Sequence, residues 1–225
     1  MQKKENNFLS LIINILVPTI ILMKFSTPDT LGPTQGFVLA LLLPLSYGLY
    51  DGLKNKRWNL IAIIGLVSIV LTGGIGLLHL NAKWLAVKEA AIPGMIAIII
   101  FATIPTRFSI LKMILDKVID QKVLAKHLEK VSDKQYYSNC CKRYSYLLGL
   151  SFLVSSILNY VLARSIVVSQ AGSTQFAEEL GRLTALSFVI IAIPSTCFLA
   201  LIFYLILRDL NKISGLKLEE LIIKK

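Results

Sequence analysis

The stretch LTALSFVIIAIPSTCFLALIFYLIL, residues 183–207, contains no charged side chain and decides the fold class. A helix of about 20 apolar residues spans the roughly 30 Å hydrocarbon core of a bilayer. The rest of the chain has the same character, since 55% of its 225 residues are hydrophobic and 16% are charged, against about 25% charged in soluble domains. The sequence therefore predicts an all-α, polytopic membrane helix bundle that forms a single membrane domain over residues 1–225.

Apolar stretches of suitable length predict six transmembrane helices. The predicted spans are approximately residues 8–23, 36–53, 58–80, 90–105, 144–163 and 183–207. The first and fourth are short, so thinning of the bilayer or snorkelling of flanking lysines would have to help them. Lys3 and Lys4 precede the first stretch as in a signal peptide, but no small-x-small cleavage site follows, which indicates an uncleaved first span.

The distribution of basic residues predicts the orientation. With the N-terminus placed in the cytoplasm, 19 of the 24 Lys and Arg residues fall in inside segments and 5 in outside segments. Short cytoplasmic loops are enriched in these residues. The split predicts six spans with both termini cytoplasmic, and it attributes the net charge of +11 to the membrane rather than to nucleic acid.

Along the segment 107–133, apolar residues recur at helical spacing with lysines between them. Its apolar positions include Leu111, Leu115 and Leu128, and five lysines from Lys112 to Lys130 lie between them. Basic amphipathic helices lie on anionic membrane surfaces. We expect a cytoplasmic amphipathic helix between spans four and five, either as a connector lying on anionic lipids or as a docking site for another protein.

The sequence gives no support for an enzyme, a cofactor or a metal site. None of the 13 Asp and Glu residues lies near the middle of a predicted span, which disfavours a proton relay. No phosphate-binding loop, catalytic serine motif or HExxH is present. Cys140, Cys141 and Cys197 form no metal-ligand spacing. We predict no catalytic residues, no cofactor and no metal.

Two predicted spans carry polar stripes. Span two places Pro44, Tyr47, Gly48 and Asp51 on one helix face, and span five carries Ser151, Ser155 and Asn159 at intervals of four, followed by Arg164. Such faces either pack against another helix or line a solute path. The candidate polar or solute-lining residues are Tyr47, Asp51, Ser151, Ser155, Asn159 and Arg164. The candidate helix breaks are Pro44, Gly73, Gly74 and Pro194.

Three places in the chain resemble a known family: Pro18 within the opening span, the run Pro44-Leu45-Ser46-Tyr47 leading to Asp51 and Lys56-Arg57, and the segment from Trp84 to Glu89. With these the chain is similar, over roughly residues 8–115, to bacterial inner-membrane proteins related to intracellular septation protein A. In that family an aromatic-rich run ends in Lys-Pro-Thr, whereas here Glu89 and Ala90 follow Lys88. The resemblance implies a bacterial inner-membrane location and a role in the cell envelope or division.

Two functions follow as hypotheses. The first is a non-enzymatic envelope protein that acts through its helix bundle, with anionic lipids at the cytoplasmic face and a second copy or an envelope protein as partner. The second is a small transporter whose path is lined by Tyr47, Ser155, Asn159 and Arg164. Because Arg164 is cationic, this alternative favours an anionic solute.

Overall fold

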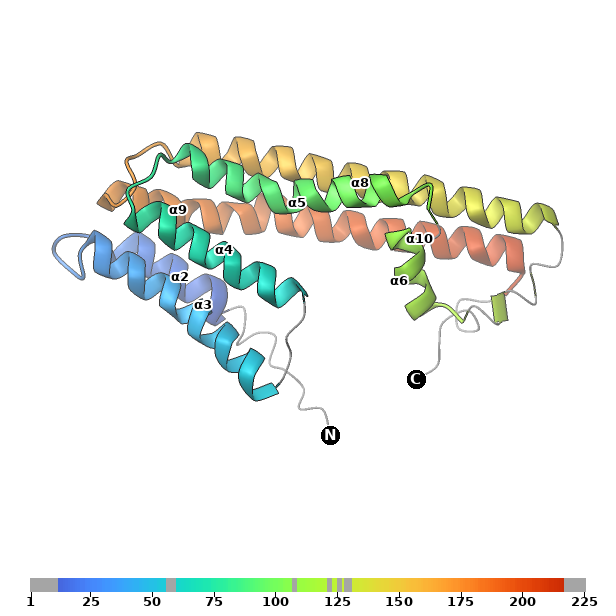
Figure 1. Cartoon of the computed structure of the whole chain (residues 1–225), viewed down its shortest axis with the longest axis horizontal. Coiled ribbons are helices and arrows are strands. Elements are labelled where there is room, and N and C mark those ends of the chain that lie inside the picture. The colour runs from blue at the N-terminus through green and yellow to red at the C-terminus, as the bar shows by residue number, and fades with distance from the viewer. Residues whose placement is uncertain are drawn as a thin grey trace. The chain divides into compact units, whose positions relative to one another are not determined.

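The computed structural model describes residues 12–55, 60–106, 109–120, 123–124, 127 and 131–216. Over these residues the structure is helical and contains no β-strand (Figure 1). Its elements are η1 Ile12–Leu16, α2 Val17–Ile20, η2 Ile21–Phe25, α3 Pro33–Asn55, α4 Leu60–Leu77, α5 Lys83–Thr103, α6 Ile110–Val118, α8 Val131–Ile166, α9 Thr174–Ser187, η3 Phe188–Ala192 and α10 Ile193–Ser214, where η marks a π-helix. The all-α prediction is confirmed.

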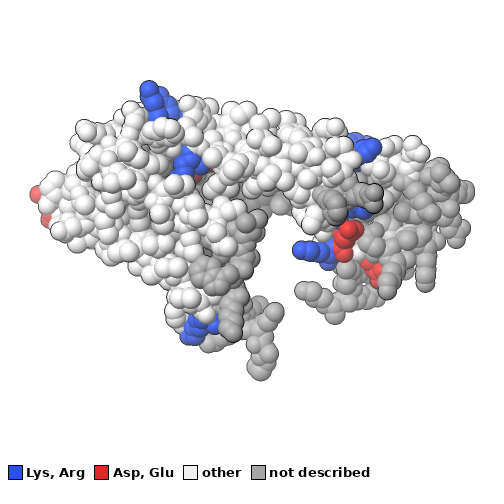
Figure 2. Space-filling view, viewed as in Figure 1, with Lys and Arg blue, Asp and Glu red and all other residues white. Residues whose placement is uncertain are grey.

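Four helical segments are long and apolar enough to cross a membrane: Pro33–Lys54, Lys83–Thr103, Gln135–Ile166 and Thr174–Ser214. Two shorter apolar helices cover Asn14–Phe25 and Ile63–Leu77. Within the described residues, each of the six predicted spans therefore overlaps a helical segment. Outside the grey atoms, most of the face drawn in Figure 2 carries no charged side chain, as expected of apolar helices that suit a membrane.

The fourth predicted span is shorter than the helix that the structure has, because α5 begins at Lys83 rather than at residue 90. At about 1.5 Å per residue, α5 is about 32 Å long and matches the hydrocarbon thickness. Lys88 and Glu89 thus lie inside a candidate membrane-spanning helix. This length removes the need for a thinned bilayer that the shorter prediction carried.

The chain divides into two compact units, whereas the sequence predicted one domain. Unit 1 comprises residues 1–90 and 158–191, and unit 2 comprises residues 91–157 and 192–225. Each unit has a buried hydrophobic cluster of its own.

Unit 1 is a bundle in which α2, α3, α4 and α9 lie side by side (Figure 1). Its core contains Phe37 of α3 against Phe176 of α9, with ring centroids 5.9 Å apart. Small residues let the helices approach closely: a Cβ on Gly76 of α4 would lie 2.3 Å from the ring of Phe37. Ser173 caps α9 by accepting a hydrogen bond from the Phe176 amide at 3.1 Å.

Two side chains form hydrogen bonds to the loops of unit 1. The His79 ring nitrogen Nδ1 lies 2.7 Å from the Ala171 carbonyl oxygen and joins the loop after α4 to the loop before α9. Gly172, in the left-handed region with φ +87°, leaves room for that ring, since a Cβ there would lie 2.1 Å from it. The Glu179 carboxylate accepts hydrogen bonds from the amides of Val168 and Ser169 at 3.0 and 2.9 Å. This end of the unit is therefore well ordered by polar contacts.

In unit 2, α6, α8 and α10 share a core that contains Leu115, Tyr144, Ile206 and Leu210. A buried carboxylate ties α8 to α10: Asp209 Oδ2 accepts hydrogen bonds from the Tyr144 hydroxyl at 2.7 Å and from Arg143 at 2.5 Å. Arg208 lies 3.3 Å from the other oxygen. The two arginines are about half exposed, so their remaining donors reach the surroundings while Asp209 stays 6% exposed.

The prediction of one amphipathic helix over residues 107–133 is wrong. α6 ends at Val118, because Ile119 adopts extended backbone with φ −107° and ψ 135°. The periodicity itself was informative, since Leu111, Leu115, Ile119 and Leu124 are almost fully buried in the unit 2 core. The apolar face of α6 is therefore covered by the protein's own helices. Residues 107–108, 121–122, 125–126 and 128–130 lie outside the described part of the chain.

Candidate solute-binding cavity

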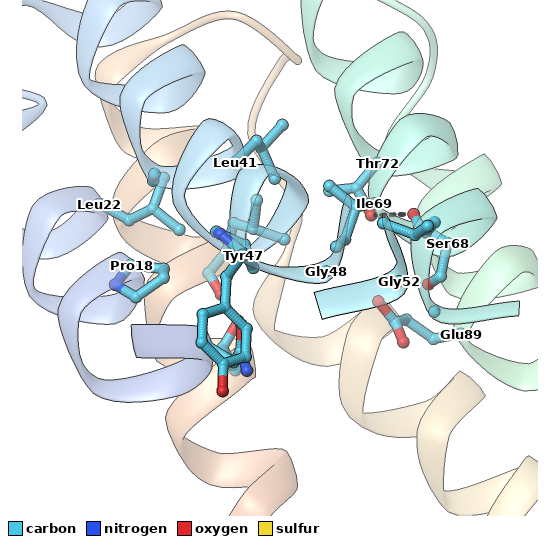
Figure 3. A pocket seen from close by; sticks show the side chains of 17 residues that line it. Pro18, Leu22, Leu41, Tyr47, Gly48, Gly52, Ser68, Ile69, Thr72 and Glu89 are labelled. Carbon is cyan, nitrogen blue, oxygen red and sulfur yellow. Dashed lines mark hydrogen bonds between the residues drawn. The ribbon is translucent and has the colours of Figure 1, made fainter. Parts of the chain in front are cut away.

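Unit 1 contains a cavity of about 460 Å³, a size typical of small-molecule sites. It is bounded by η1, α2, η2, α3, α4, α5 and α9 (Figure 3). Its apolar wall includes Pro18, Leu22, Leu41, Leu66 and Leu180. The polar residues that line it are Asn14, Tyr47, Ser68, Thr72, Glu89 and Thr184.

Several of the residues that line this cavity are glycines. Gly48 and Gly52 of α3 and Gly65 of α4 line the cavity without contributing a side chain. Gly65 lies on the same face of α4 as Ser68, Ile69 and Thr72, and a Cβ on it would meet no atom within 4 Å. A larger side chain at residue 65 would therefore enter open space on the cavity face.

A lysine holds together the polar side of the cavity. The Lys88 ammonium donates to Ser68 Oγ at 3.1 Å and to Thr72 Oγ1 at 2.9 Å, and it lies 2.7 Å from Glu89 Oε1. Because Ser68 and Thr72 are four residues apart on α4, both hydroxyls face the same side. An ammonium has three donors, so these three oxygens satisfy it.

The two side chains of this ion pair differ in their exposure to the cavity. The Lys88 side chain is 9% exposed and is not among the lining residues, whereas the Glu89 side chain is 30% exposed and lines the cavity. Ionisable residues in membrane helices face the bundle interior and pair with one another. The ion pair therefore turns its negative end toward the cavity while its total charge is neutral.

Among the predicted site residues, Tyr47 and Pro44 line this cavity, and Figure 3 shows Tyr47 on the side of Pro18 and Glu89 on the side of Ser68. Asp51 lies in the last turns of α3, and its side chain is outside the described part of the structure.

The predicted stripe on span five lies elsewhere. Ser151, Ser155 and Asn159 are half-buried positions of α8 that do not line the cavity. Arg164 is exposed and lines a second, polar cavity of about 530 Å³ together with His79 and Lys83. The proposed path through Tyr47, Ser155, Asn159 and Arg164 is thus not assembled as one lining, because α8 does not contribute to the cavity that Tyr47 lines.

The candidate helix breaks divide into two kinds. α3 continues through Pro44, and α4 continues through Gly73 and Gly74. Pro194 is instead the second residue of α10, which follows the π-helix η3, just as Pro18 is the second residue of α2, which follows η1. Proline has no N–H for the i→i−4 bond, and the wider π-turn is a common adjustment of the backbone in such places.

Sequence reasoning missed Lys88, Glu89, Ser68 and Thr72 as a cluster. The predicted fourth span begins at residue 90 and leaves out Lys88 and Glu89, because this charged pair bounds the apolar run. The length of this apolar run could have revealed their place in the helix. The run falls below the roughly 17 residues needed to cross a bilayer unless Lys88 and Glu89 belong to the helix. Ser68 and Thr72 also stand four apart in an otherwise apolar span.

The described residues contain no group of three or more His, Cys, Asp or Glu side chains placed to hold a metal ion. No protein-family model, curated protein or solved structure matches the chain. The fold and the site therefore define a class of protein. It is a helical protein with four helices long and apolar enough to cross a membrane, and one of its two units contains a cavity.

Proposed function

We propose that this protein is a multi-pass transporter that binds a small solute in the unit 1 cavity and has no enzymatic activity. The observation that carries the proposal is the cavity together with the partly buried ion pair of Lys88 and Glu89 at its wall, which belongs to a candidate membrane-spanning helix. Buried charges cost free energy unless they are paired, and in membrane helices they mark substrate pathways. Six crossings, cytoplasmic termini and a bacterial inner-membrane location, all predicted from the sequence, complete the proposal.

The test compares two glycine substitutions in α4. Gly65→Leu fills the cavity face, whereas Gly74→Leu also enters open space but lies away from the lining residues. The thermal unfolding of purified full-length protein is followed against a panel of cationic, anionic and neutral solutes. We expect a solute that raises the midpoint of the wild type and of Gly74→Leu but not of Gly65→Leu, and that the wild type carries across proteoliposome membranes.

The proposal is contradicted if Gly65→Leu keeps every solute response of the wild type, or if no solute raises the midpoint. Gly74→Leu controls for the gain in helix propensity, which both substitutions share.

The envelope role that the septation resemblance implies stays a prediction. Its own test is the distribution of a fluorescent fusion in cells. Enrichment at the septum would favour it, and an even distribution without a division defect on deletion would count against it.

A further inference from the structure

We propose that the solute of the unit 1 cavity is an amphipathic organic cation. The inference rests on the proposed function and names the chemical class of its substrate. The observation behind it is that one carboxylate, Glu89, and one phenol, Tyr47, line the same largely apolar cavity (Figure 3).

The first argument for a cationic solute is the charge of the residues that line the cavity. Glu89 is the one charged residue among the described residues that line the cavity. The nearest cation, Lys88, lies behind the wall with its ammonium bonded to Ser68, Thr72 and Glu89. An anion entering the cavity would meet a carboxylate and find the donors of Lys88 already used. This reverses the anionic preference that Arg164 suggested, because Arg164 lies at a different cavity.

The second argument is that the Glu89 carboxylate can accept further hydrogen bonds. An ionised carboxylate offers about four lone-pair sites, and Lys88 contacts Glu89 through one oxygen, Oε1. The carboxylate can therefore accept from a ligand while the internal pair stays intact. An ammonium or guanidinium group would gain a charge-assisted hydrogen bond there.

The third argument is the apolar wall. Leu22, Leu41, Leu66, Ile69 and Leu180 line the cavity and would bury the hydrocarbon part of a ligand. Tyr47 adds an aromatic ring, and rings attract cations through their faces. A small inorganic cation would leave this wall without a partner. A bulky cation with apolar substituents uses both the wall and the carboxylate.

The experiment uses two probes of nearly the same size and opposite charge, tetraphenylphosphonium and tetraphenylborate. Each is titrated calorimetrically into the purified full chain in nonionic detergent, and the signal from protein-free micelles is subtracted. We expect the wild type to bind the phosphonium with a Kd lower than that of the borate by about tenfold or more. Equal affinities, or tighter binding of the borate, would overturn the inference without any variant.

Glu89→Gln then assigns the preference to its residue. Glutamine keeps an oxygen that accepts from Lys88 but removes the charge, so phosphonium binding should weaken about tenfold or more while borate binding does not weaken. The control is Glu178→Gln, an exposed residue of unit 1 paired with Arg182, which should behave as wild type. Unchanged phosphonium binding in Glu89→Gln would overturn the inference.

Gly65→Leu separates this inference from the proposed function. If a solute binds and Gly65→Leu abolishes its binding, but the charge of the probe and Glu89→Gln make no difference, the cavity is a solute site and only the cationic class is wrong. If Gly65→Leu leaves all binding unchanged, the proposed function itself fails.

Discussion

At the residue scale, Lys88 decides whether the polar side of the cavity is stable. Lys88→Met keeps the aliphatic stem but leaves Glu89 without its ion-pair partner. Removing one partner of a buried pair costs about 3–5 kcal/mol. We expect the lower end of this range, because Glu89 is 30% exposed. The free energy of unfolding, measured by denaturant titration in detergent, should fall accordingly.

The double variant Lys88→Met/Glu89→Gln removes both charges and should recover most of that loss. Lys83→Met, at an exposed position of the first turn of α5, is the matched control and should change little. A double variant as unstable as the sum of its single variants would show that the two charges do not act as a pair.

Tyr144 is the second residue whose role the structure defines. Its hydroxyl donates to the buried Asp209 at 2.7 Å and so joins α8 to α10. Because hydrogen bonds to charged groups contribute about 1.5–3 kcal/mol, Tyr144→Phe should lower the free energy of unfolding by about that amount. Tyr146→Phe, on the same helix but 57% exposed, should leave it unchanged. Equal effects of the two substitutions would contradict the assigned role.

At the element scale, α3 and α4 pack through small residues. Gly76→Ala places a Cβ 2.3 Å from the buried Phe37 ring, which itself packs on Phe176. Overpacking of this kind costs about 1–3 kcal/mol. Gly74→Ala, two residues earlier in α4, meets open space and should be neutral or stabilising by up to about 1 kcal/mol through helix propensity. The thermal midpoint of Gly76→Ala should therefore lie below that of Gly74→Ala.

The reverse order of the two midpoints would mean that Phe37 can move aside and that α3 and α4 do not depend on Gly76. The sequence singled out Gly73 and Gly74 for flexibility, yet α4 is continuous there. The sequence shows which positions of α4 lack a side chain. Only the structure shows that the Phe37 ring occupies the space beside Gly76, whereas no atom of the described residues occupies the space beside Gly74.

Element positions followed from the sequence better than element faces. All six apolar runs became helices, because a run of apolar residues is a local property and in lipid only a helix or a closed barrel satisfies its backbone. The face of α6 did not follow. Leu111 and Leu115 have the spacing of a surface-lying helix, yet they are buried in the core of unit 2. Periodicity shows that a face is apolar and does not show whether lipid or protein covers it.

At the scale of the whole molecule, the charge count predicts that Asn81 and Gln135 lie on opposite sides of the membrane. With Cys140, Cys141 and Cys197 replaced by alanine, Asn81→Cys should react with a membrane-impermeant maleimide in intact cells. Gln135→Cys should react only after permeabilisation. Both positions are exposed, so a difference in labelling reports sidedness. Labelling of Gln135→Cys in intact cells would contradict the predicted orientation.

The sequence by itself determined that this protein is helical, that its apolar runs suit a membrane and where its helices lie. These properties depend on the composition of continuous segments. The tertiary structure decided the cavity and its charged wall. Lys88 meets Ser68 and Thr72 across 20 and 16 positions of the chain, and no local pattern reveals that meeting. Its physical reason is that a lysine in a membrane helix must find oxygen partners, and only the packing of α5 against α4 determines which oxygens they are.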